Sequence, residues 1–141
     1  ALGNLAARDR AVADAIVAAT RAIDPTLAML AISGTEGEHA ARTAGSPVYS
    51  EIFADRGYTP NGQLVPRDQK GAMIHDAKEA TDRLLAFLDT GQMPTVGGDP
   101  IPLAAHSVCV HGDGPDAVAM AADIRARLTA QGVTIRSFLA V

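Results

Sequence analysis

Apolar residues that recur every three or four positions predict helices in several parts of the chain. Residues 8–23 show this spacing at Ala11, Ala15, Ile16, Ala19 and Ile23. Residues 76–90 show it again at Ala80, Leu84, Leu85 and Leu88. Two further helices are expected over 36–44 and 115–130. Asp76 is suited to cap the helix over 76–90, and Pro115 is suited to begin the helix over 115–130.

Short apolar runs between these helices predict strands. We expect them near residues 27–33, 48–54, 106–111 and 133–138. The first run is continuously apolar from Leu27 to Ile32, which is typical of a strand covered on both faces. Strands that alternate with helices imply right-handed crossovers and parallel pairing. The pattern therefore predicts an α/β fold with a parallel sheet, either open or part of a barrel.

Length and composition narrow the class of protein. A chain of 141 residues, 48% of them hydrophobic, makes one globular domain or one piece of a larger domain. Its net charge of -4 and the absence of Lys/Arg runs argue against binding nucleic acid or an anionic membrane. No apolar run approaches the roughly 18–20 residues that span a bilayer. The single cysteine, Cys109, is expected to be a buried thiol, and a cytoplasmic protein fits these features.

Two of the predicted strands end in charged residues, and strand ends carry the active sites of parallel α/β folds. Asp55 and Arg56 close the second strand, and His111 and Asp113 follow the third. Residues two apart on an extended chain point the same way, so His111 and Asp113 are expected to converge on one proton or one metal ion. His111 would then act as a general acid and base. The alternative interpretation is that Asp113 only caps the next helix, beside glycines that form a tight turn.

A second polar group surrounds the second strand and the long irregular stretch 57–70 that follows it. Its members are Glu51, Asp55, Arg56, Tyr58 and Arg67. Arginine binds carboxylates through paired hydrogen bonds, so this group is suited to a carboxylate or amide substrate. A salt bridge that closes the strand end is the simpler interpretation. The chain has no metal-binding motif, P-loop or dinucleotide-binding glycine pattern.

Three segments of the chain, taken together, resemble the LamB/YcsF family. They are Ala1-Leu2-Gly3-Asn4, the stretch from Glu51 to Tyr58, and the stretch from Ser107 to Asp113. Their order and spacing agree along essentially all 141 residues. One departure is Gly3, where the family usually has tyrosine. The resemblance implies part of a seven-stranded (β/α) barrel similar to polysaccharide deacetylases, in which residues 1–141 are a single domain piece from the carboxyl-terminal half.

The resemblance also implies a reaction, which is hydrolytic ring opening of 5-oxo-L-proline to L-glutamate coupled to ATP hydrolysis. The family is described as the first of three components of such a 5-oxoprolinase, so the implied partners are subunits B and C. On this basis the catalytic residues would be His111, Asp113 and Asp55, and the substrate-binding residues Arg56, Arg67, Tyr58 and Glu51. ATP is the expected co-substrate, and the need for a divalent metal stays open. The piece alone is expected to be inactive and to pair with an amino-terminal half of its barrel or with a second copy.

Two other functions stay open from the sequence. A similar barrel would suit a metal-dependent deacetylase or amidohydrolase that acts on N-acyl sugars, with most of its metal ligands outside this chain. The chain is also compatible with a non-catalytic fragment that binds partner subunits.

Overall fold

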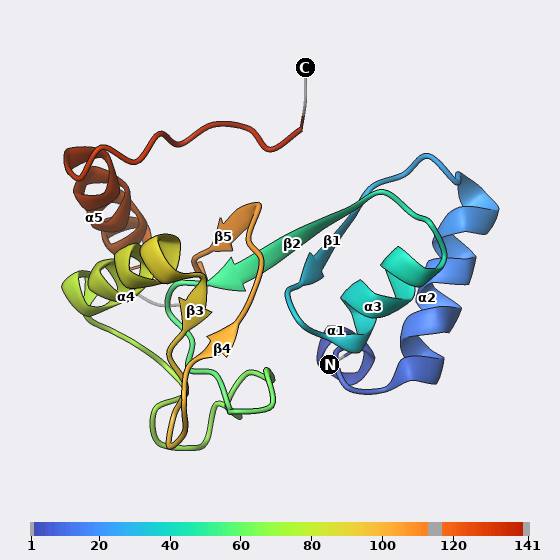
Figure 1. Cartoon of the computed structure of the whole chain (residues 1–141), viewed down its shortest axis with the longest axis horizontal. Helices are drawn as coiled ribbons and strands as arrows, with labels where there is room; N and C mark the ends of the chain where they lie inside the picture. Colours follow the sequence, from blue (N-terminus) through green and yellow to red (C-terminus); the bar gives the residue numbers. More distant parts are fainter. Residues whose placement is uncertain (1, 113–116, 140–141) are drawn as a thin grey trace. The chain divides into compact units, whose positions relative to one another are not determined.

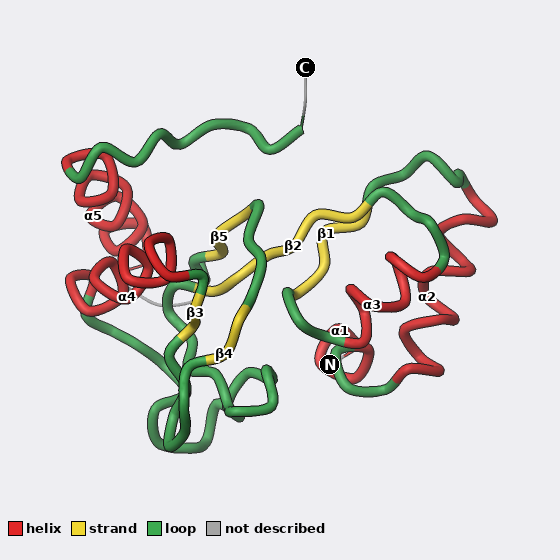
Figure 2. Tube along the Cα trace, in the orientation of Figure 1, coloured by secondary structure: helices red, strands yellow, loops and turns green. Residues whose placement is uncertain are grey.

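Helices and strands alternate along the chain in the computed structural model, which describes residues 2–112 and 117–139 (Figure 1). The helices are α1 (Leu2–Ala6), α2 (Arg10–Ile23), α3 (Glu36–Thr43), α4 (Ala77–Thr90) and α5 (Ala117–Ala130). The strands are β1 (Met29–Ile32), β2 (Val48–Phe53), β3 (Gln92–Met93), β4 (Ile101–Pro102) and β5 (Ser107–Cys109) (Figure 2). Within the described part, no helix is long and apolar enough to cross a membrane.

The main sheet has three strands in the order β1-β2-β5. β1 and β2 are parallel, with Met29 opposite Val48 and Ile32 opposite Glu51. β3 and β4 form a separate antiparallel pair that the hydrophobic pattern does not predict, because each has only two residues. The prediction of an α/β fold with parallel strands alternating with helices is confirmed.

Backbone contacts divide the chain into two compact units. The first comprises Ala1–Ile52 and Ala104–Ser107, and the second comprises Phe53–Leu103 and Val108–Val141. The boundary between the units therefore falls within β2, between Ile52 and Phe53.

In the first unit, α2 and α3 pack together beside β1 (Figure 1). Their contact buries four small residues, Ala13, Val17, Ala40 and Ala41. Asp9 begins α2, and its carboxylate accepts a hydrogen bond from the backbone N–H of Val12 at 3.1 Å. This bond satisfies one of the amide groups that every helix leaves open at its first turn.

The buried face of α2 differs from the predicted one. Ala13 and Val17 are the buried residues, whereas Ile23 is 82% exposed. Alanine occurs on every side of this helix, so the spacing of apolar residues does not single out one face. Leu30 of β1 is also 51% exposed rather than covered. β1 lies at the edge of the described sheet, so it has a strand neighbour on one side only.

In the second unit, α4 packs against α5 and β3 (Figure 1). Asp76 caps α4 as predicted, because its carboxylate accepts a hydrogen bond from the backbone N–H of Glu79 at 2.7 Å. Ala80 and Leu84 are buried as predicted, but Leu88 is 51% exposed, and Phe87 takes its place in the core.

Two predicted features near the carboxyl end have different outcomes. The predicted strand over 133–138 is wrong, since the structure assigns no strand to these residues. A strand exists only where a neighbour completes its hydrogen bonds, and among the described residues none pairs with this segment. The predicted helix start at Pro115 lies outside the described residues.

The stretch after β2 is irregular but tightly held. The backbone N–H of Gly57 donates to the carbonyl of Ala72 at 3.0 Å, and the N–H of Val65 donates to the carbonyl of Gly57 at 2.9 Å. A Cβ atom on Gly57 would lie 2.0 Å from the carbonyl oxygen of Gly71. Only glycine allows two backbone segments to approach this closely.

Candidate active site

The candidate active site is a histidine–carboxylate pair at the ends of β2 and β5. Nδ1 of His111 lies 2.9 Å from Oδ1 and 3.0 Å from Oδ2 of Asp55. The backbone N–H of His111 also donates to Oδ2 of Asp55 at 3.0 Å. The backbone bond from Ala54 N–H to the carbonyl of Cys109, 3.0 Å long, joins the two chain segments just before the pair.

The geometry of this pair sets what the imidazole can do. A carboxylate only accepts hydrogen bonds when ionised, so Nδ1 of His111 carries the proton that faces Asp55. Nε2 is then the nitrogen with the available lone pair, and it can take up a proton and return it. Asp55 is 3% exposed and the His111 side chain 21% exposed, so the imidazole has access to solvent whereas the carboxylate is buried.

Phe53 supports the same imidazole from its face. The two rings are stacked, with centroids 5.3 Å apart and planes inclined by 21°. The stacked Phe53 ring limits rotation of the imidazole out of its plane. The hydrogen bond from Nδ1 to Asp55 fixes which edge of the imidazole faces the carboxylate. The imidazole is therefore held in one orientation.

Asp113, the predicted second partner of His111, lies outside the described residues. The catalytic roles of His111, Asp55 and Asp113 stay predictions. What the structure adds is that the two charged strand ends meet through Asp55 and His111, as parallel strands require of their carboxyl ends.

Arg56 is buried beside this pair and donates to backbone carbonyls. Its Nε bonds the carbonyl of Ala72 at 3.0 Å, and its Nη2 bonds the carbonyl of Val65 at 2.7 Å. These bonds tie the irregular loop to the end of β2. Arg67 lies on the same loop and is exposed. Substrate binding by either arginine stays a prediction.

Tyr58 is fully buried, with 0% of its surface exposed. Its hydroxyl oxygen accepts a hydrogen bond from the backbone N–H of Phe53 at 3.0 Å. The guanidinium carbon of Arg83 lies 5.5 Å from the centre of the Tyr58 ring. Arg83 also donates to the carbonyls of Arg56 at 2.5 Å and Pro94 at 3.1 Å. Burial lowers the pKa of Arg83.

Sequence reasoning missed Arg83, because an arginine on a helix is usually a solvated residue. A weak signal was present, since Arg83 is flanked by Ala80 and Leu84 on the face of α4 that the apolar spacing turns inward.

Glu51, the remaining predicted site residue, belongs to the first unit. One of its carboxylate oxygens accepts a hydrogen bond from the hydroxyl of Ser107 at 3.0 Å.

The predicted buried thiol of Cys109 is only partly buried. Its β5 strand is short and half-exposed, with Val108 39% exposed.

The first unit also contains a buried polar cluster that the sequence did not indicate. The carboxylate of Glu38 accepts hydrogen bonds from the backbone of Gly34 at 2.7 Å, from Arg42 at 2.8 Å and from the Ser50 hydroxyl at 2.5 Å. Burial alone would raise the pKa of Glu38, but these three donors outweigh it and hold the pKa below its usual range. Nδ1 of His106 accepts the backbone N–H of Ser50 at 3.0 Å. These contacts join α3 and the residue before β5 to β2, so we interpret them as structural.

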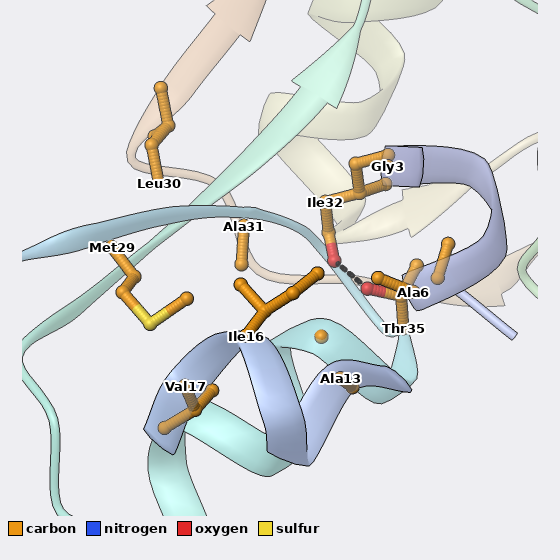
Figure 3. A pocket seen from close by; sticks show the side chains of 12 residues that line it. Gly3, Ala6, Ala13, Ile16, Val17, Met29, Leu30, Ala31, Ile32 and Thr35 are labelled. Carbon is orange, nitrogen blue, oxygen red and sulfur yellow. Dashed lines mark hydrogen bonds between the residues drawn. The ribbon is translucent and has the colours of Figure 1, made fainter. Parts of the chain in front are cut away.

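An apolar cavity of about 190 Å³ lies between α1, α2 and β1 in the first unit (Figure 3). Ile16 and Met29 line it, as do Thr35 and Ile32, and the Thr35 hydroxyl donates to the Ile32 carbonyl at 2.6 Å. Gly3 also lines the cavity, and a Cβ atom there would meet nothing within 4 Å. None of the described residues that line this cavity has a titratable side chain.

Metal binding would need more ligands than the described residues bring together. Among the residues that the structure describes, no group of three or more His, Cys, Asp or Glu side chains is placed to hold a metal ion. Asp55 and His111 would supply two ligands.

Parallel strands that alternate with helices, with a contact between Asp55 and His111 after two of them, define an α/β protein with a histidine–carboxylate pair at its strand ends. The particular family follows from comparison with known proteins: the LamB/YcsF family model matches residues 1–141, and the chain belongs to this family.

Relatives with assigned names agree with this membership. A protein named as the A subunit of 5-oxoprolinase, from Azorhizobium caulinodans, is 47% identical over 138 residues, which cover 98% of this chain and 54% of that protein. A protein of the same name from Kocuria rhizophila is 44% identical over 138 residues, covering 98% and 55%. The crystal structure of a lactam utilization protein from Thermus thermophilus matches with a TM-score of 0.85 and 37% identity, covering 96% of this chain and 54% of that one. The chain thus spans about half the length of these relatives.

Proposed function

We propose that this chain is part of the A subunit of an ATP-dependent 5-oxoprolinase, which opens the ring of 5-oxo-L-proline to give L-glutamate. The observation that carries the chemistry is the contact between His111 and Asp55, which leaves Nε2 of His111 as a base. The substrate is supported by the names of relatives that are 47% and 44% identical. These names do not favour the alternative of a deacetylase of N-acyl sugars.

The lactam is a stable amide, so its carbonyl carbon must be activated before water can attack. In the proposed scheme ATP phosphorylates the carbonyl oxygen. His111 then takes a proton from the attacking water, and Asp55 stabilises the imidazolium that forms. The imidazolium returns this proton to the ring nitrogen as the C–N bond breaks. A second water hydrolyses the resulting acyl phosphate to the glutamate side chain and inorganic phosphate.

Binding of the substrate is proposed to use the loop after β2. Arg67 is exposed there, and its guanidinium suits the carboxylate of 5-oxo-L-proline. Roles for Arg56, Tyr58 and Glu51 in substrate binding, and for Asp113 in catalysis, stay predictions.

The proposed protein works in a complex. The names of the relatives imply a multi-subunit enzyme, and we propose that ATP, with a divalent cation on its phosphates, is bound jointly with subunits B and C in the cytoplasm. We also propose that these residues form part of a seven-stranded barrel similar to polysaccharide deacetylases, completed by a further part of the full-length protein or by a second copy. Residues 1–141 alone are then expected to be inactive.

The proposal is tested with the full-length protein combined with subunits B and C. We expect 5-oxo-L-proline to stimulate ADP release, with one glutamate formed for each ADP. Omission of either companion protein, or use of residues 1–141 alone, should abolish the stimulation. Release of acetate from an N-acetyl sugar by the metal-loaded protein without ATP would favour the deacetylase instead. Absence of both activities would favour a non-catalytic binding role.

A further inference from the structure

We propose that Tyr58 is a positioning residue that sets the orientation of His111 through Phe53, and that Arg83 holds Tyr58 in place. This inference rests on the proposed function only for the role of His111 as a base.

The first step is the bond between Tyr58 and the end of β2. The backbone N–H of Phe53 donates to the phenol oxygen of Tyr58 at 3.0 Å, and both residues are buried. A buried backbone N–H must have a partner, and here a side chain five residues along the chain supplies it. The position of the Tyr58 ring therefore fixes the backbone of Phe53.

The second step leads from Phe53 to His111. The Phe53 ring is stacked on the imidazole with centroids 5.3 Å apart. Asp55, two residues further on, contacts Nδ1 of the same imidazole. A shift in the backbone of Phe53 would therefore disturb the face of the His111 ring and its hydrogen bond together.

The third step concerns what holds Tyr58. Arg83 lies over the Tyr58 ring, 5.5 Å from its centre, and a guanidinium at this distance is attracted to the ring face. The same guanidinium donates to the carbonyls of Arg56 and Pro94, so its own position is fixed by two bonds. Lysine lacks the planar guanidinium group that makes these contacts simultaneously.

A direct role of Tyr58 in substrate binding is the competing interpretation. The side chain has 0% exposed surface, and its hydroxyl accepts a protein N–H. Positioning and substrate contact predict different kinetics. Loss of positioning lowers kcat at unchanged KM, whereas loss of a substrate contact raises KM.

The test uses Tyr58→Phe in the full-length protein, which removes only the hydroxyl and keeps the ring. The matched control is Tyr49→Phe, which alters the other tyrosine of the sequence, located in the first unit. One measurement is the ¹⁵N NMR spectrum of the histidines without substrate, which reports the tautomer of His111. The other is the kinetics of 5-oxo-L-proline-dependent ADP release with subunits B and C. Arg83→Lys is measured in parallel.

We expect Tyr58→Phe to convert the single Nδ1–H tautomer of His111 to a mixture and to lower kcat roughly tenfold or more at unchanged KM. Arg83→Lys should act in the same direction, and Tyr49→Phe should match the wild-type protein in both measurements. If Tyr58→Phe does not fold, Arg83→Lys decides the question by the same criteria.

The proposal is overturned if the His111 spectrum and kcat stay as in the wild-type protein, or if KM rises while kcat is unchanged. The two hypotheses fail separately. A wild-type complex without 5-oxo-L-proline-dependent turnover would refute the proposed function, whereas the NMR comparison would still decide whether Tyr58 positions His111.

Discussion

Asp55 accepts hydrogen bonds from both the ring and the backbone of His111, through Nδ1 at 2.9 Å and the main-chain N–H at 3.0 Å. A single carboxylate thus anchors the residue at two points. A flip of the imidazole would replace the Nδ1 bond by a carbon facing the carboxylate, so the ring keeps Nε2 turned away from Asp55. This fixed orientation is what general base catalysis requires, and it leads to the first two predictions.

Replacement of His111 by alanine should remove the base and leave the fold intact. We expect 5-oxo-L-proline-dependent ADP release by the full complex to fall by roughly 10²-fold or more, the usual contribution of a general base. The protein should still fold with a lower thermal midpoint, because the substitution removes the ring that stacks on Phe53 and leaves the buried Asp55 carboxylate with the main-chain N–H of residue 111 only. His75→Ala is the control, since His75 is exposed and precedes α4. Near-normal turnover of His111→Ala would refute the site assignment.

Asp55→Asn tests the tautomer and not only the presence of the imidazole. The amide oxygen can still accept the backbone N–H of His111, but the amide nitrogen then faces Nδ1 and donates to it. This places the ring proton on Nε2, so the base is lost although the residue stays in place. We expect a loss on the order of 10²–10⁴-fold in kcat. Asp82→Asn, on the exposed face of α4, should leave kcat unchanged.

Much of the fold could be predicted because its elements are long enough to show a period. β2 and α4 were placed to within a residue or two, since six and 14 residues define a pattern. The two-residue strands β3 and β4 cannot show an alternation, and they exist because they pair with each other. The exposure of Leu30 could not be predicted either, because an apolar run does not show whether another element covers each face of the strand.

The candidate site was predictable where topology alone brings residues together. Asp55 and His111 follow strands of one parallel sheet, so their proximity follows from strand direction. The contact of Arg83 with Tyr58 depends on how α4 packs against the loop after β2. The spacing of residues along the sequence does not predict that packing. The same is true of the bond between Ser50 and Glu38, which are 12 residues apart on different elements.

Glu38 should make the stability of the first unit depend on acid pH. Its pKa is lowered in the folded state, so its contribution is fully present above its ordinary pKa of about 4.5 and is lost as the pH falls through the lower folded value. Glu38→Gln should therefore reduce the free energy of unfolding at pH 7 by about 1–3 kcal/mol, because it weakens the charge-assisted hydrogen bonds from Gly34, Arg42 and Ser50. The difference from the wild-type protein should shrink below pH 4.5.

Urea denaturation at a series of pH values measures this dependence. The control is Asp14→Asn, which removes an exposed carboxylate paired with Arg10 on α2. Exposed pairs of this kind contribute at most about 1 kcal/mol, so the control should follow the wild-type curve closely. A Glu38→Gln protein whose deficit is the same at pH 7 and pH 4 would show that the charge of Glu38 is not responsible.

Gly57→Ala should destabilise the second unit, because the added methyl group has no space. Its carbon would lie 2.0 Å from the carbonyl oxygen of Gly71, and that atom belongs to the backbone. The two segments cannot simply separate, since the N–H of Gly57 binds the carbonyl of Ala72 and its own carbonyl accepts the N–H of Val65. We expect the free energy of unfolding to fall by about 1–3 kcal/mol or more, as for other substitutions that overfill a packed site.

Gly3→Ala is the matched control for this change, because a Cβ atom at Gly3 meets nothing within 4 Å. Gly3 lies in α1, where alanine is favoured over glycine by up to about 1 kcal/mol, so the control should be neutral or slightly more stable. The urea midpoint of Gly57→Ala should therefore fall, whereas that of Gly3→Ala should stay the same or rise slightly. The dependence of the unfolding free energy on urea concentration should be unchanged in both variants. Because Gly57 follows Asp55 and Arg56 directly, Gly57→Ala should also lower turnover, whereas Gly3→Ala should not. Equal midpoints for Gly57→Ala and the wild-type protein would mean that the loop does not approach β2 as closely as the structure requires.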